Sequence, residues 1–220
     1  MKHIIYVLLL SLGLVALSAC TLPRQEEAKS IPVSEQSEAT DINASSSVVA
    51  DGSYQVKTAD SRLAWQAAKV TAKHTGTVSI KSGAVQVADN KLTGASFVID
   101  MTSITSDEGI DGLVKHLSSA DFFDAAAYPE AKLTVTAVKA GAKDGEYAVT
   151  GDLTIKNITA AIDFTARVSA DAGGLKAEAN LDIDRTKWEI KYGSGKFFQN
   201  LGDKMIDDDI KFSVIIKASR

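Results

Sequence analysis

The stretch HLSSADFFDAAAYP, residues 116–129, decides the fold, because it interrupts a long series of two-residue alternations with a helical pattern and an aromatic pair. On either side of it, residues 54–104 and 132–217 read as consecutive β-strands separated by Gly, Asp and Asn turns. A sheet that curls on itself leaves an open end, and this stretch would cover it. The sequence therefore predicts an all-β fold, an antiparallel β-barrel of eight or more strands, with one short helix over about 110–118 in an inter-strand insertion.

The clearest strand pattern lies in residues 175–183, where apolar and polar side chains alternate behind the turn Gly173-Gly174. Between residues 77 and 87 the apolar phase changes from even to odd positions across Ser82 and Gly83, which predicts a bulge or a glycine bend. The last strand places these apolar residues on one face: Ile206, Ile210, Phe212, Val214 and Ile216. Closure of such strands into a barrel removes exposed sheet edges.

The N-terminal segment predicts a secreted protein. Lys2 and His3 precede an apolar run over residues 4–17, which is too short for the roughly 20 residues of a spanning helix and is typical of a signal peptide. Its end, Leu17-Ser18-Ala19-Cys20, resembles the bacterial lipoprotein box, in which the cysteine is acylated, with chains such as palmitate, and becomes the new N-terminus. Cys20 is the one cysteine of the chain and has no disulfide partner. The alternative is an ordinary signal peptide in which Cys20 is incidental.

Three regions follow from this interpretation: residues 1–19 as a lipoprotein signal peptide, 20–51 as the acylated cysteine and a flexible tether, and 52–220 as the barrel domain. The tether is rich in Ser, Glu, Ala and Thr and has no sustained apolar period. Thr21, rather than Asp, follows the cysteine, which favours the outer membrane over the inner one. The sequence thus predicts a lipid-anchored protein of the cell envelope that faces the periplasm.

Charge and motif content argue against nucleic-acid binding, catalysis and metal binding. Loss of residues 1–19 removes Lys2, so 24 basic residues become 23 against 28 acidic ones, a formal charge of −5 that gives no reason to seek nucleic acid. His74 and His116 lie in no HExxH motif, and the chain has no GxSxG turn. We therefore expect no enzyme, no metal site and no cofactor beyond a bound lipid.

Three polar motifs receive structural interpretations. Asp207, Asp208 and Asp209 are expected to form a solvated strand start rather than a cation site, because neighbouring strand residues point to opposite faces. The sequence Gly193-Ser194-Gly195-Lys196 lacks the P-loop spacing and is expected to be a flexible turn beside the barrel mouth. Asp184 and Arg185, with Asp203, are expected to form an ion pair that fixes the second insertion, residues 185–204.

The remaining candidate site is apolar. Each large apolar residue taken alone is best explained as ordinary core. Together, however, the aromatics concentrate in the two insertions, while Val, Ile, Ala and Leu line the strands, a pattern that suggests a cavity with a bulky mouth. The candidate ligand-binding residues, in the cavity or at its mouth, are Trp65, Phe97, Leu117, Phe122, Phe123, Phe164, Trp188, Tyr192, Phe197 and Phe198.

Several segments carry a family resemblance: FVIDMTSI at 97–104, HLSSADFFDAAAYPEAKL at 116–133, GDLTIKNIT at 151–159, LDIDRTKWEIKYGSG at 181–195 and LGDKMIDDDIKFSV at 201–214. In this order they resemble the YceI-like family of bacterial lipid-binding (polyisoprenoid-binding) proteins. One departure is SRLAWQAAKVTAKHTGTVSI at 61–80, where the family more commonly has S-x-V-x-F-x-V-x-H. The resemblance implies a hollow, lipocalin-like barrel, often dimeric, that encloses a long isoprenoid or similar amphiphile in the periplasm.

Two functional hypotheses follow. The first is the binding, carriage or storage of a long apolar lipid, polyisoprenoid-like, inside a periplasmic barrel. This barrel is attached to the membrane through its lipidated N-terminus, as a monomer or a homodimer. The second is a stress-related or surface interaction protein with a solid barrel, in which the exposed loops are the working parts.

Overall fold

The computed structural model describes residues 49–220. The expected signal peptide, Cys20 and most of the expected tether lie outside the described residues. The strands are β1 (Gly52–Val56), β2 (Arg62–Lys69), β3 (Ala72–Ala88), β4 (Lys91–Asp100), β5 (Glu130–Ala140), β6 (Glu146–Ile155), β7 (Ile158–Asp171), β8 (Gly174–Asp184) and β9 (Asp209–Ser219). The helices are α1 (Asp111–Leu117) and the 3-10 turns η1 (Thr58–Asp60), η2 (Met101–Ser103), η3 (Arg185–Trp188) and η4 (Gly202–Lys204).

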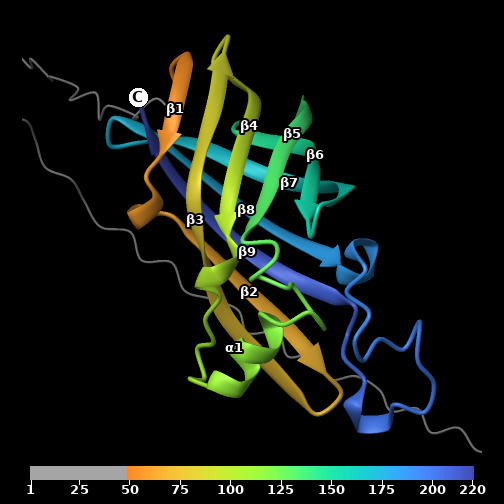
Figure 1. Ribbon diagram of the computed structural model, residues 1–220. Coiled ribbons are helices and arrows are strands. Elements are labelled where there is room, and N and C mark those ends of the chain that lie inside the picture. The colour runs from red at the N-terminus through yellow and green to blue at the C-terminus, as the bar shows by residue number, and fades with distance from the viewer. Residues whose placement is uncertain (1–48) are drawn as a thin grey trace, which may run out of the picture. The chain divides into compact units, whose positions relative to one another are not determined.

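The nine strands form one antiparallel sheet in the order β1-β3-β2-β9-β8-β7-β6-β5-β4, and a pairing of β3 with β4 closes it (Figure 1). β1 and β2 both lie between β3 and β9, because β1 pairs with the end of β3 and β2 with its beginning. They act as one strand that is interrupted at η1, so the barrel has eight strand positions. The predicted all-β antiparallel barrel is confirmed.

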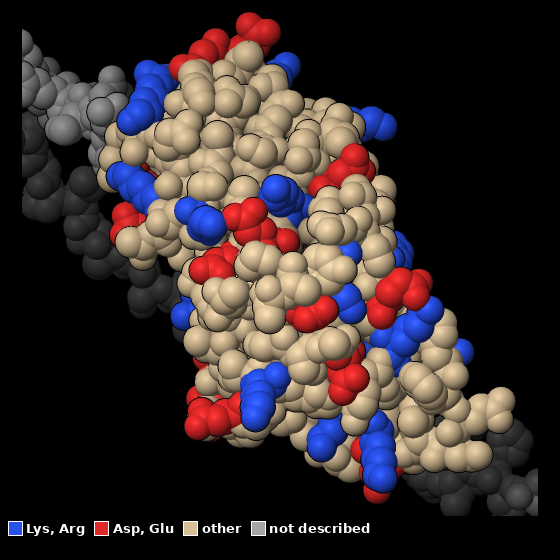
Figure 2. All heavy atoms as spheres, viewed as in Figure 1, with Lys and Arg blue, Asp and Glu red and all other residues tan. Residues whose placement is uncertain are grey.

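Inward and outward side chains alternate as the sequence indicates. On β8, residues 177, 179, 181 and 183 face the interior, and the residues between them are more exposed. On β3 the pairing with β4 shifts register between Ile80 and Ser82, which is the predicted bulge. A Cβ on Gly83 would lie 2.7 Å from a ring carbon of Phe97, so the bend also needs a residue without a side chain. Figure 2 shows basic and acidic side chains dispersed over one outer face.

The two ends of the barrel differ in their connections. One end has short turns at 89–90 and 172–173, and the other carries two long insertions, 101–129 and 185–208. Asp89 and Asn90 both have positive φ, of 51° and 57°, as a two-residue type I′ turn requires. The α1 end, at the bottom of Figure 1, is therefore the end with room for a functional site.

The N-terminal residues of the described chain lie against the short-turn end. Val49 is 6% exposed in a core cluster with Tyr54 and Leu92. The Tyr54 hydroxyl donates to the Ala50 carbonyl at 2.6 Å, and the Arg220 guanidinium donates to the Asp51 carbonyl at 2.6 Å. The last residues of the expected tether, 49–51, are thus held by the barrel.

The first insertion closes the opposite end. Helix α1 lies within the predicted range of 110–118. Its last residue, Leu117, and Phe123 in the segment after it are buried in the core. The segment before the helix runs beside the first half of β3: Thr105 N–H donates to Thr77 O, and Asp107 N–H donates to Thr75 O, both at 2.9 Å. β4 does not reach this part of β3, so the segment satisfies an edge that would otherwise be open.

Gly76 is the tightest point of this closure. It is the cross-strand neighbour of Trp65, and a Cβ there would lie 1.9 Å from the Thr105 carbonyl oxygen and 2.6 Å from the Trp65 ring. We expect Gly76→Ala to destabilise the barrel by about 1–3 kcal/mol, since both neighbours must move. Gly94→Ala, on β4 with no atom within 4 Å, is the matched control. Urea unfolding of both variants measures the difference, and an equal loss of stability would contradict the packing argument.

Candidate functional site

The barrel core consists of two apolar clusters with a cavity along them. One cluster lies at the α1 end and includes Trp65, Phe122 and Trp188, and the other lies at the short-turn end and includes Tyr54 and Leu175. Phe97 and Phe164 pack against both clusters. The cavity has a volume of about 190 Å³ and is bounded by every strand from β2 to β9. It is therefore an internal feature of the closed barrel.

The cavity wall is apolar along its length. On β9 it extends from Ile210 to Ile216, which is roughly 20 Å of strand. Glu178 is the one charged residue at the wall, yet its side chain is 46% exposed and its carboxylate pairs with the Lys176 ammonium at 2.7 Å. The remaining wall residues are Val, Ile, Leu, Ala, Met, Phe and Trp. Such a wall excludes ions and offers a chain of hydrocarbon a continuous surface.

The ten candidate residues fall into three places. The residues that line the cavity are Trp65, Phe97, Leu117, Phe123 and Phe164. Phe122 and Trp188 are buried in the cluster at the α1 end but do not line the cavity. Tyr192, Phe197 and Phe198 lie outside, with about half of their surface exposed. Whether any of the ten contacts a ligand stays a prediction.

Aromatic packing joins the exposed surface to the closed end of the cavity. Phe122 lies edge-on to His116, with ring centroids 4.9 Å apart, and Tyr192 lies edge-on to the same His116 at 4.7 Å. The neighbouring Phe123 faces the cavity. Trp188 is fully buried and its indole N–H donates to the Leu153 carbonyl at 3.0 Å, which attaches the second insertion to β6. The two insertions therefore form one cover.

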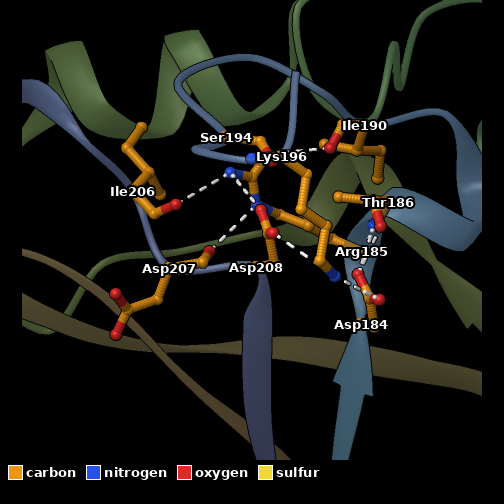
Figure 3. A network of polar contacts seen from close by, with 9 residues as sticks. All are labelled: Asp184, Arg185, Thr186, Ile190, Ser194, Lys196, Ile206, Asp207 and Asp208. Atoms are coloured by element: carbon orange, nitrogen blue, oxygen red, sulfur yellow. Dashed lines mark hydrogen bonds and ion pairs between the residues drawn. The ribbon is translucent and has the colours of Figure 1, made fainter. Parts of the chain in front are cut away.

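A buried arginine organises the second insertion (Figure 3). Arg185 is 1% exposed, and its guanidinium donates to the carbonyls of Ile190, Asp207 and Ile206 at 2.7, 3.0 and 3.1 Å. Its Nη2 lies 3.3 Å from the Asp208 carboxylate. Burial lowers the pKa of Arg185 and Asp208 opposes this, and the group stays charged.

Three expectations about polar residues need correction. Arg185 pairs with Asp208, not Asp203, because the antiparallel pairing of β8 with β9 places residues 184 and 209 opposite one another. Asp208 is consequently not a solvated residue: its side chain is 15% exposed and also lies 3.4 Å from the Lys196 ammonium. The turn at 193–195 is fixed rather than flexible, since Ser194 is fully buried and its hydroxyl accepts from the Lys196 N–H.

Sequence reasoning missed most of the cavity wall. Aliphatic strand residues such as Leu63, Leu133 and Val214 line it, and Ala177 and Ala179 leave it open. The alternation of the strands was the signal that could have identified them. Trp65 has a feature that no pattern indicates: its indole N–H is buried without a hydrogen-bond partner among the described residues.

Two classes of site are not found among residues 49–220. No group of three or more His, Cys, Asp and Glu side chains is placed to hold a metal ion. No helix of this part of the chain is long and apolar enough to cross a bilayer.

A closed antiparallel barrel around an apolar cavity defines a binding-type barrel. Residues 54–218 match the YceI-like domain, and the chain belongs to the YceI-like family. It is 36% identical over 105 residues to a UPF0312 protein of Photorhabdus laumondii, an alignment that covers 46% of this chain and 50% of the relative. It is 38% identical over 94 residues to Protein YceI of Escherichia coli O157:H7, covering 40% and 48%. The chain thus spans about half the length of these curated relatives.

Solved structures share the fold. BcnA of Burkholderia cenocepacia superposes with a TM-score of 0.62 at 23% identity, over 74% of this chain and 99% of that one. A polyisoprenoid binding domain from Saccharophagus degradans, implicated in plant cell wall breakdown, superposes with a TM-score of 0.60 at 19% identity, over 76% and 97%. At these identities the likeness concerns the barrel itself.

The Arg185 network predicts that loss of a buried ion pair lowers the free energy of unfolding more than loss of a surface ion pair does. We expect Arg185→Met to destabilise the protein by about 3–5 kcal/mol, because it leaves three carbonyls without their donor and removes the buried positive charge beside Asp208. Lys211→Met is the control: it breaks the exposed 2.9 Å pair with Asp182 and should leave the free energy of unfolding nearly unchanged, because solvent screens that pair. Denaturant unfolding gives both values, and comparable losses would show that the network is not structural.

The lowered pKa of Asp184 predicts that acid destabilises the fold. Burial raises its pKa, but hydrogen bonds from Lys196 and Thr186 outweigh that and lower it from 3.8 to about 2. A carboxylate with a depressed pKa stabilises the folded state above its unfolded pKa and loses this as the pH falls through the folded value. We expect roughly 1–2 kcal/mol to be lost between about pH 4 and pH 2.

The measurement is the urea midpoint as a function of pH, with Asp184→Asn as the comparison. The urea midpoint of the variant should be lower than that of the wild type at pH 4 and should fall less between pH 4 and pH 2. Parallel curves for the two proteins would rule out the assigned role of Asp184.

Proposed function

We propose that this protein binds a long apolar lipid chain of the polyisoprenoid type inside its barrel and carries or stores it. The cavity carries the proposal: strands β2 to β9 surround it, and apolar residues line it apart from Glu178, whose carboxylate pairs with Lys176. An apolar chain is the class of ligand that gains most from leaving water there. No catalytic role is part of the proposal.

The shape of the cavity supports a chain rather than a compact ligand. Its volume of about 190 Å³ is below the roughly 300–1,000 Å³ of pockets that hold drug-sized molecules, so a long chain fits only if the inward side chains move apart. The cavity extends along the barrel between Leu117 at one end and Leu92 at the other. Each 100 Å² of hydrocarbon removed from water is worth about 2.5 kcal/mol before the costs of ordering. A predominantly apolar wall would bind such a chain through buried area and discriminate weakly among chains.

Similarity to known proteins supports the same ligand class. The Saccharophagus degradans domain with this fold is described as polyisoprenoid binding. The chain also belongs to the YceI-like family over residues 54–218. We extend the ligand class, though not a particular lipid, from that domain to this chain.

The proposal includes an envelope location. We propose that Cys20 is acylated and attaches the barrel to the membrane on its periplasmic side, on the grounds of the lipoprotein-like sequence around it. The alternative of a solid barrel with functional loops is less well supported, because the interior contains a cavity. Pairing of two barrels remains a part of the proposal that analytical ultracentrifugation would test.

Filling the cavity tests the proposed function. Ala179 lines it from β8, and we expect Ala179→Phe to occupy the chain's path and reduce bound lipid at least about tenfold. Ala161, on β7, faces outward and is exposed, so Ala161→Phe is a control of equal size and chemistry that should keep its lipid. The measurement is organic-solvent extraction of each purified protein followed by mass spectrometry.

Titration of the delipidated proteins with a long-chain isoprenoid alcohol gives a second readout. Wild type and Ala161→Phe should bind it, and Ala179→Phe should not. The proposal is wrong if the wild type yields no lipid and binds no isoprenoid, or if Ala179→Phe behaves like the wild type while remaining folded.

A further inference from the structure

All large hydrophobic side chains that residues 49–220 leave exposed lie at one end of the barrel. They belong to the β2–β3 turn, the segment before α1 and the second insertion, and they are Val70, Ile110, Tyr192, Phe197, Phe198 and Met205. We call these six the apolar rim. The opposite connections, 89–90, 141–145 and 172–173, contribute none. Single exposed apolar residues need no explanation, but a gathering at one end does.

Backbone contacts hold most of the rim in place. The Val70 N–H donates to the Met205 carbonyl at 3.2 Å, so the β2–β3 turn is attached to the second insertion. The N–H groups of Phe197 and Phe198 both donate to the carbonyl of the fully buried Ser194, at 3.2 and 3.0 Å. The rings therefore project from a turn that is itself anchored.

The rim lies at the end where the cavity is covered. Tyr192, a rim residue, packs on His116 of α1 and on Phe122, with ring centroids 4.7 and 5.6 Å apart. Leu117 and Phe123, the sequence neighbours of those two, line the cavity. Whatever touches the rim is thus separated from the cavity by one layer of side chains.

Charge around the rim is balanced. Residues 185–208 contain five basic and four acidic side chains, and the Lys191 ammonium lies over the Phe197 ring at 4.8 Å. Both signs are also mixed over the face seen in Figure 2. The contact chemistry is therefore aromatic and aliphatic rather than that of a basic patch seeking anionic headgroups.

We propose that the apolar rim docks the α1 end of the barrel on a lipid bilayer by inserting its side chains at the headgroup level. This rests on the proposed function, because a chain that leaves an apolar cavity avoids water only if the mouth lies against its membrane. Half-exposed aromatics with lysines beside them are typical of membrane interfaces. Six such side chains expose on the order of 400–500 Å² of apolar surface, less than the roughly 800 Å² per partner of a stable dimer.

The length of the preceding chain is compatible with this orientation. Val49 lies at the short-turn end, and 28 residues separate it from Cys20. A relaxed coil of this length has an end-to-end distance of about 30 Å and can extend to about 100 Å. The longest strand, β3 with 17 residues, limits the barrel to roughly 58 Å, which is within the reach of the extended chain. An anchor at Cys20 therefore allows the far end of the barrel to face the bilayer.

The test is sedimentation with vesicles of phosphatidylcholine, using the chain from residue 20 onward with Cys20→Ser, so that neither the apolar run over residues 4–17 nor an acyl chain can mediate binding. We expect this protein to bind, and the additional pair Phe197→Ser and Phe198→Ser to weaken binding at least about tenfold. The pair Lys187→Gln and Lys204→Gln is the control for charge and should leave binding unchanged. Adding anionic lipid should change binding by less than about twofold.

Any of three results would overturn the docking proposal: no binding to phosphatidylcholine, binding that requires anionic lipid, or a serine pair that binds as well as its parent. A concentration-dependent dimer that the serine pair abolishes would likewise assign the rim to a second copy of this chain. Circular dichroism verifies that each variant is folded.

Extractable lipid separates this inference from the proposed function. The serine pair should keep its bound lipid, because its side chains do not line the cavity. Ala179→Phe should lose lipid and still bind vesicles. Vesicle binding without any extractable or titratable isoprenoid would leave the rim as a docking surface and remove the proposed cargo.

Discussion

Closure of the sheet through β3 is the constraint on which the rest of the structure depends. Its 17 residues pair with β2 along their first half and with β1 along their second, while β4 pairs along the other edge. One strand can serve three partners because it bends at the bulge near Gly83. Once the ring is closed, the inward faces of opposite strands are held apart, and the size of the inward side chains decides whether the centre fills.

Two polar features then finish the end that the strands leave open. The segment around Thr105 pairs with the edge of β3 that β4 does not reach. Arg185 gathers three carbonyls and Asp208 beneath the second insertion. A buried charge is expensive unless it is fully paired, so this arrangement specifies one conformation of the insertion as well as stabilising it. The cover over the cavity is accordingly an ordered part of the fold.

Much of this architecture could be predicted from the sequence, because alternation along a strand is a local signal. The strand character of 175–183, the bulge after Ile80 and the helix within 110–118 all follow from neighbouring residues. The partner of Arg185 could not, since the pairing with Asp208 joins residues 23 apart through strand register. The same limit applied to the aromatics: Phe122 and Phe123 are adjacent, yet one packs under the surface and the other faces the cavity.

The contrast between the barrel's two ends has a kinetic consequence. A turn of two residues, such as Asp89-Asn90, cannot move away from the barrel by itself. Opening it would break the hydrogen bonds between the two strands that it joins. The insertions 101–129 and 185–208 can part from one another by separating side-chain contacts alone. In this sense the barrel is closed at one end and can open at the other. The residence time of a bound molecule would then be set by how often the ring contacts among His116, Phe122 and Tyr192 break, rather than by its affinity for the cavity wall.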